Sequence, residues 1–145
     1  DAYGQLLVDE LKPFIDRQYR TRPEAESTGL AGSSLGGLVS LYLGLKYPHV
    51  FSRVGVMSPS VWWDRRVILK YVRDATPKPR VRIWVDIGTR EGHYHVENAR
   101  LLRAGLKKSG WLEGDDLHYE EIAGGTHSEG AWAQRFGRML LFLFA

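Results

Sequence analysis

The sequence predicts an α/β domain in which a parallel sheet is flanked by helices. Three observations support this fold class. Short apolar segments rich in β-branched residues alternate with amphipathic helical patterns along the chain. Glycine and proline separate these segments, without an internal repeat or a low-complexity stretch. The chain has 145 residues, 43% of them hydrophobic, so we expect a single domain, residues 1–145, with a core of its own.

The chain opens with a helix, which the first strand–helix unit follows. Residues 3–19 carry leucine, phenylalanine and isoleucine at helical spacing, and Pro13 is expected to kink this helix. Residues 27–32, with the sequence STGLAG, are short and apolar and end in glycine, which is typical of a buried strand. The helical pattern of residues 36–47 then ends at Pro48.

The rest of the chain repeats the strand–helix order. The clearest strand covers residues 79–88, where four β-branched residues occupy alternate positions. The other expected elements, in chain order, are a strand at 52–58, a helix at 64–75, a helix at 96–109, a strand at 117–124 and a helix at 128–144. In such a fold, reactive groups gather beyond the carboxyl ends of the strands.

The stretch GLAGSSLGGL contains the motif GxSxG, formed by Gly32, Ser34 and Gly36 between the first strand and its helix. The two glycines permit a sharp turn that lifts the serine hydroxyl above the sheet, because a side chain at either position would clash across the turn. The helix N-terminus supplies unpaired N–H groups, so the amide of Leu35 is a candidate oxyanion donor. We expect Ser34 to be a nucleophile; the alternative is a glycine-rich turn without chemistry.

A serine nucleophile needs a base, and the chain has five histidines. His127 is favoured, because it lies in the glycine-rich stretch AGGTHSEGAW, after the last strand and before the last helix. His118 lies within a strand, where a structural role is expected, and His49 lies in an ordinary loop.

The base in turn needs a carboxylate to orient its ring, and two residues beside the third strand compete for this role. Glu91 follows the strand end in the stretch GTREG, from which it can reach the loop that carries His127. Asp86 lies inside the strand and points away from the apolar residues on either side. Glu91 is favoured, and Asp86 remains the alternative acid.

Four stretches, in order, resemble one branch of the α/β-hydrolases. They are VDELKPFIDRQYRT, GLAGSSLGGLVSLYLGLKYPHVFSRVGVMSPSVWW, VDIGTREG and AGGTHSEGAW. They are similar to those of the esterase D-type family, which includes feruloyl and enterochelin esterases, S-formylglutathione hydrolases and mycolyltransferases. The resemblance covers nearly the whole chain. It implies the C-terminal part of an α/β-hydrolase fold and the cleavage of carboxylic esters.

By this resemblance, the family's nucleophile falls on Ser34, its acid on Glu91, its histidine on His127 and its first oxyanion donor on Leu35. The implied reaction passes through an acyl-enzyme on Ser34, with His127 as base and Glu91 as the acid that orients it. It implies a small-molecule ester as substrate and no cofactor. An acyltransferase would use the same residues.

The chain departs from the family at its N-terminus. In the family, roughly a hundred residues of further strands precede the segment that resembles residues 3–20, and an early loop there carries the second oxyanion amide. We therefore expect an N-terminally incomplete domain, whose exposed sheet edge favours a homo-oligomer or a partner segment. A non-catalytic binding module is an alternative function. A metal-dependent hydrolase built on His93, His95 and Glu97 is a weaker one.

Two tryptophans follow the second strand and are candidates for substrate binding. Trp62 and Trp63 belong to the stretch SPSVWW, next to the expected reactive edge of the sheet. One or both are expected to line a pocket for an acyl or aromatic alcohol group, and the alternative is packing against the rim of the sheet.

The composition excludes several other classes of function. The formal net charge is +3, and basic residues occur in pairs at most, so no nucleic-acid partner is expected. The longest apolar run, MLLFLFA, is far shorter than the roughly 18–20 residues that span a bilayer, so no membrane partner is expected. The absence of cysteine excludes disulfides, thiolate catalysis and cysteine-ligated zinc.

Overall fold

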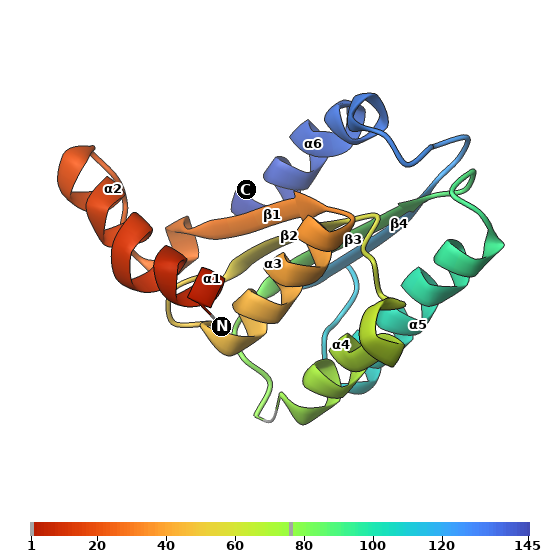
Figure 1. The fold of residues 1–145 in the computed structure, drawn as a ribbon, viewed down its shortest axis with the longest axis horizontal. Coiled ribbons are helices and arrows are strands. Elements are labelled where there is room, and N and C mark those ends of the chain that lie inside the picture. The colour runs from red at the N-terminus through yellow and green to blue at the C-terminus, as the bar shows by residue number, and fades with distance from the viewer. Residues whose placement is uncertain (1, 76) are drawn as a thin grey trace.

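A computed structural model describes residues 2–75 and 77–145. Its centre is a sheet of four parallel strands that lie side by side in chain order (Figure 1). The strands are β1 (Gly29–Ser33), β2 (Arg53–Met57), β3 (Arg82–Gly88) and β4 (Leu117–Ile122). The predicted parallel sheet is therefore confirmed, and the carboxyl ends of all four strands lie at one edge.

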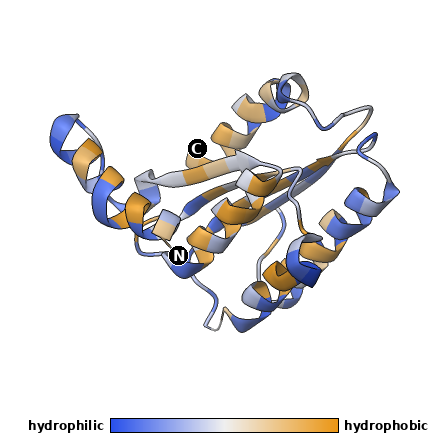
Figure 2. Cartoon of the chain, viewed as in Figure 1, coloured by the Kyte–Doolittle hydropathy of each residue, from blue (hydrophilic) through white to orange (hydrophobic). Residues whose placement is uncertain are grey.

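Helices cover both faces of the sheet, as predicted. Three of them pack on one face and the last packs on the other (Figure 1). The three are α3 (Leu35–Lys46), α4 (Trp63–Asp74) and α5 (His93–Lys108); the last is α6 (Glu129–Phe144), and a 3-10 turn, η2 (Ala25–Ser27), precedes β1. α3 is apolar over most of its length (Figure 2), because the sheet and α4 both pack against it. In the described part of the chain, no helix is long and apolar enough to cross a membrane.

The N-terminal helix expected at residues 3–19 is continuous but changes its winding. It consists of α1 (Ala2–Gln5), a π-helical turn η1 (Leu6–Leu11) and α2 (Lys12–Gln18). Pro13 gives the physical reason, because its ring has no N–H and clashes with the carbonyl four residues earlier in a regular α-helix. The wider π-helical turn relieves this clash, so the effect of Pro13 lies in the turn that precedes it.

Alternation along the strands divides the core into two layers. On one face, the β-branched residues of β2 and β3 pack against the buried leucines and isoleucines of α3, α4 and α5. On the other face, Met57 and Trp84 pack against Met139 and Leu143 of α6. Gly55 lets α6 approach, since a Cβ there would lie 2.4 Å from the Met139 sulfur. On β3, Ile83 and Val85 face the layer of three helices, so the residues at the alternate positions, such as Trp84, point toward α6.

Two element boundaries differ from those expected by three residues, and the others differ by at most two. β3 begins at Arg82 rather than at residue 79, because the N–H of Val81 turns back to the carbonyl of Pro79 at 2.9 Å instead of joining the sheet. α5 begins at His93 rather than at residue 96, directly after Gly92, whose φ of 95° suits glycine. The loop between β3 and α5 therefore covers residues 89–92.

Candidate active site

The turn between β1 and α3 holds Ser34 in a strained conformation. Its φ and ψ angles are 56° and −121°, a combination that residues with a side chain rarely adopt. The Ser34 N–H donates to the carbonyl of Met57 at 3.0 Å, which ties the turn to the end of β2. A Cβ on Gly32 would lie 2.6 Å from the carbonyl carbon of Gly36, so the strand and helix backbones approach closely only with glycine there. The same expectation was wrong for Gly36, because a Cβ there would point into open space.

The Ser34 hydroxyl stands at the N-terminus of α3. Its Oγ lies 3.3 Å from the Oγ of Ser60, in the loop after β2. Leu35 is the first residue of α3, and the N–H of a first helical residue has no partner within its own helix. This end of α3 therefore presents an N–H donor and a positive partial charge beside the hydroxyl. Across residues 2–75 and 77–145, no hydrogen bond joins Ser34 to His127.

Glu91 and His127 meet between the loops that follow β3 and β4. The Oε2 of Glu91 lies 2.7 Å from the Nδ1 of His127. The Glu91 side chain is 1% exposed and the His127 ring 46% exposed, so a buried carboxylate holds a ring that solvent reaches. Trp132 packs edge-to-face against the ring at 4.8 Å. Because Nδ1 is engaged, proton exchange at this ring falls to Nε2.

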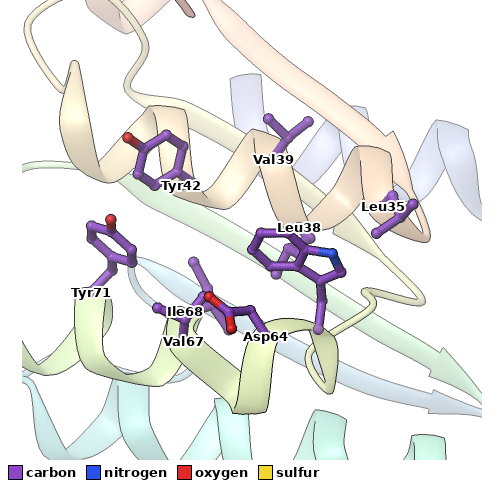
Figure 3. Close-up of a pocket in the computed structure, with 9 residues that line it drawn as sticks. Leu35, Leu38, Val39, Tyr42, Asp64, Val67, Ile68 and Tyr71 are labelled. Carbon is purple, nitrogen blue, oxygen red and sulfur yellow. The ribbon is translucent and has the colours of Figure 1, made fainter. Parts of the chain in front are cut away.

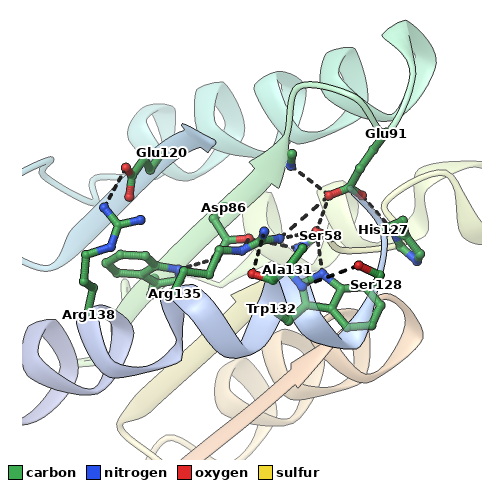
Figure 4. Close-up of polar contacts among 12 residues, drawn as sticks. Ser58, Asp86, Glu91, Glu120, His127, Ser128, Ala131, Trp132, Arg135 and Arg138 are labelled. Carbon is green, nitrogen blue, oxygen red and sulfur yellow. Dashed lines mark hydrogen bonds and ion pairs between the residues drawn. The ribbon is translucent and has the colours of Figure 1, made fainter. Parts of the chain in front are cut away.

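A buried hydroxyl behind His127 fixes the orientation of Glu91 (Figure 4). Ser58 donates to the Oε1 of Glu91 at 2.6 Å, and the N–H of Gly88 donates to the same oxygen at 2.8 Å. Arg135 and Trp132 donate to the Ser58 hydroxyl at 2.7 and 2.9 Å. A hydroxyl has one proton and two lone pairs, and Ser58 uses all three. The Glu91 carboxylate therefore accepts hydrogen bonds from a backbone N–H and from a side-chain hydroxyl, which together fix its orientation.

Asp86, the other candidate acid, pairs with Arg135 rather than with His127. Asp86 is fully buried, with its Oδ1 2.9 Å from the Arg135 Nε and its Oδ2 accepting a hydrogen bond from Trp84 at 2.6 Å. Burial raises the pKa of Asp86 above its usual value, and the Trp84 indole and the Arg135 guanidinium oppose this rise. The same guanidinium lies 3.8 Å from Glu91, so one buried cation faces two carboxylates.

A close backbone approach brings the two loops together. A Cβ on Gly88, the last residue of β3, would lie 2.4 Å from the carbonyl oxygen of Gly125. The N–H of Arg90 donates to that oxygen at 3.0 Å, and the N–H of Gly124 donates to the Thr89 hydroxyl at 2.9 Å. The position of His127 relative to Glu91 is thus set by backbone contacts rather than by side-chain packing alone.

The other candidate residues lie apart from this cluster. His118 stacks on Trp84 at 4.0 Å within the sheet, which is a structural role. His93 and His95 lie in the first turn of α5, and no group of three or more potential ligands in the described residues could hold a metal ion. Trp62 and Trp63 are 41% and 48% exposed; Trp63 lines a groove between α3 and α4, whereas Trp62 is not among the residues that line it.

Sequence reasoning missed Ser58, Trp132 and Arg135, although one signal for Arg135 was present. Trp132, Arg135 and Met139 share one side of α6 at spacings of three and four residues, so a single arginine interrupts an apolar stripe. A lone aspartate interrupts the apolar strand β3 in the same way. A buried arginine needs a buried acid as its partner, so the ion pair between Arg135 of α6 and Asp86 of β3 could have been predicted from these two interruptions.

Comparisons with known proteins agree with this architecture. A model of the family described as "Putative esterase" matches residues 1–143. The uncharacterized protein YbbA of Bacillus subtilis is 26% identical over 149 residues, which cover 98% of this chain and 59% of that protein. An endo-1,4-beta-xylanase/feruloyl esterase of Xylanibacter ruminicola is 25% identical, covering 81% of this chain and 16% of that protein.

Among solved structures, the enterochelin esterase of Shigella flexneri superimposes with a TM-score of 0.85 at 26% identity. That match covers 98% of this chain and 37% of the esterase, so the chain spans a little over one third of its length. Fold and sequence agree over almost the whole of residues 1–145, and the chain belongs to the "Putative esterase" family.

Proposed function

We propose that this chain carries the reacting groups of a serine esterase that cleaves carboxylic esters through an acyl-enzyme. The hydrogen bond between Glu91 and His127 carries the proposal, because it joins a buried acid to an exposed imidazole at the same edge of the sheet as the strained Ser34 turn. The relatives support the substrate class, since proteins named as enterobactin and feruloyl esterases match this chain.

In the proposed reaction, Ser34 Oγ attacks the ester carbonyl and the Nε2 of His127 takes its proton. The hydroxyl first rotates away from Ser60, since its resting contact is with that residue; such bonds are often long or misaligned before substrate binds. Glu91 keeps Nδ1 protonated and stabilises the imidazolium. The imidazolium then protonates the leaving alcohol, and water attacks the acyl-enzyme with the same histidine as base.

The developing oxyanion needs donors aimed at it in the transition state. The N–H of Leu35 is one such donor, and the N-terminus of α3 adds a favourable potential. A single donor of this kind typically contributes a factor of about 10² to 10³ to kcat.

A fluorophosphonate probe tests the proposal directly. We expect one covalent adduct, mapped by mass spectrometry to Ser34, because only an activated serine reacts rapidly with such a probe. His127→Ala should abolish labelling, whereas the matched variant His49→Ala, in a loop outside the site, should leave it intact. Rapid labelling that persists in His127→Ala, or an adduct on another serine, would contradict the assignment.

Gly88→Ala tests whether the close approach of the two loops sets the geometry. Its Cβ would meet the Gly125 backbone at 2.4 Å and Glu91 at 2.8 Å, so the His127 loop must move. A displacement of about 1 Å costs on the order of 10² in rate, and we expect kcat for p-nitrophenyl acetate to fall by that factor. Gly137→Ala, with open space at its Cβ, should keep its kcat; equal rates in the two variants would refute this role.

A further inference from the structure

A groove with apolar walls runs between α3 and α4 (Figure 3). Its volume is about 520 Å³. Leu35 lines one end, and it is the residue that follows Ser34 in the chain. Trp63 also lines the groove, and its N–H donates to the carbonyl of Ser60, whose hydroxyl contacts Ser34. This end of the groove therefore lies next to the turn that carries Ser34.

Aliphatic side chains form the walls of the groove. Leu38 and Val39 of α3 face Val67 and Ile68 of α4 across it. At the end away from Leu35, a tyrosine from each helix lines the groove, and the rings of Tyr42 and Tyr71 pack edge-to-face at 5.0 Å. The helix from Leu35 to Tyr42 rises about 10 Å at 1.5 Å per residue. Because an extended alkyl chain zigzags, each C–C bond of about 1.52 Å advances it by roughly 1.25 Å, so about eight such bonds fill this length.

One charged side chain, Asp64, lines the groove within the part of the chain that the structure describes. Asp64 has a φ of 43° and begins a left-handed turn through Arg66, a backbone conformation that persists where the surroundings enforce it and that is frequent at ligand sites. Its carboxylate repels anionic groups, so an anionic occupant is disfavoured, and the apolar walls disfavour a charge of either sign.

We propose that this groove binds the uncharged apolar chain of the substrate ester and limits that chain to about eight carbons. The inference rests on the proposed function, because the groove selects substrates only if Ser34 is the attacking group. Each buried methylene lowers the free energy of the bound state. The groove thus sets which esters the site prefers, and the pair Tyr42 and Tyr71 sets the upper limit of chain length.

A series of p-nitrophenyl esters with acyl chains of increasing length tests the groove. We expect kcat/KM to rise roughly three- to fourfold per methylene and to fall beyond about eight carbons.

Val67→Trp fills the groove and should lower the octanoate-to-acetate ratio of kcat/KM at least thirtyfold. Tyr71→Ala removes an exposed closing ring and should move the optimum to longer chains. Leu101→Trp, on an exposed site of α5, should change neither.

Octyl acetate, which carries its long chain on the alcohol side, is measured in parallel with p-nitrophenyl octanoate, which carries it on the acyl side. The ester whose kcat/KM falls in Val67→Trp is the one whose long chain lies in the groove. If the ratios for both esters are unchanged in Val67→Trp and Tyr71→Ala, the groove proposal is wrong. If even p-nitrophenyl acetate is not hydrolysed, the proposed function fails instead. Calorimetric binding of methyl octanoate to Ser34→Ala, weakened at least tenfold by Val67→Trp, still tests the groove in that case.

Discussion

Replacing Ser34 with alanine is expected to lower kcat for an activated ester by roughly 10⁴- to 10⁶-fold. The variant loses the atom that forms the acyl-enzyme in the proposed reaction. The nearby Ser60 hydroxyl is not expected to replace it, because the strained turn places Ser34, and not Ser60, directly before the first residue of α3. The measurement is the initial rate of p-nitrophenyl acetate hydrolysis, with protein concentration checked by absorbance and folding by circular dichroism.

The adjacent serine provides a matched control for this experiment. Ser33 is the last residue of β1 and precedes the turn, so Ser33→Ala makes the same chemical change one position away. We expect it to retain kcat within about tenfold. Residual activity of Ser34→Ala above a few per cent would mean that another group attacks the ester.

Replacing Arg135 with methionine is expected to destabilise the fold by about 3–5 kcal/mol, the cost typical of breaking a buried ion pair from one side. Arg135 is 1% exposed and is the cation that faces both Asp86 and Glu91. Methionine fills most of the volume but leaves two buried carboxylates uncompensated and removes a donor from Ser58. Urea denaturation, followed by tryptophan fluorescence, measures the loss.

The pH dependence of this loss has a definite sign. Burial already raises the pKa of Asp86 from 3.8, and without the guanidinium it rises further. A carboxyl with a raised folded-state pKa contributes stability that is complete below its unfolded pKa and is lost as pH rises through its folded pKa. The deficit of Arg135→Met should therefore be smaller at pH 5 than at pH 8.

Two variants separate the ion pair from general damage to α6. Arg138→Met, on the same helix, breaks only an exposed pair with Glu120 and should cost less than about 1 kcal/mol. Adding Asp86→Asn to Arg135→Met removes the unpaired charge and keeps an acceptor for Trp84, so it should recover part of the loss. A deficit that is equal at both pH values and unchanged by Asp86→Asn would refute the electrostatic explanation.

The fold could be predicted from the sequence because its elements are encoded locally. The alternating apolar residues of β3 and the glycine-flanked turn at Ser34 each depend on neighbours within a few positions. The π-helical turn before Pro13 was not predicted, although proline chemistry explains it. Element ends were displaced by up to three residues, since these depend on backbone contacts such as Val81 to Pro79.

The sequence could predict which residues are candidates for the site, but not the contacts between them. The sequence placed Glu91 and Asp86 beside the same strand and favoured Glu91 because it lies past the strand end, but Asp86 stayed an alternative, since its partner depends on how α6 packs. The answer lies with Arg135, which arrives from α6 and takes Asp86 as its partner. Ser58 shows the same limit, because its hydroxyl joins three elements that are far apart in the chain.

The order of the strands also determines when the reacting groups come together during folding. Because β1 to β4 pair with their neighbours in chain order, each strand–helix unit can add to the edge left by the one before, and a chain emerging from the ribosome can fold in that direction. Ser34 is translated first and His127 last. Under the proposed mechanism, Ser34 gains its base only when the final loop docks beside Glu91, so we expect no ester cleavage by the partly made chain.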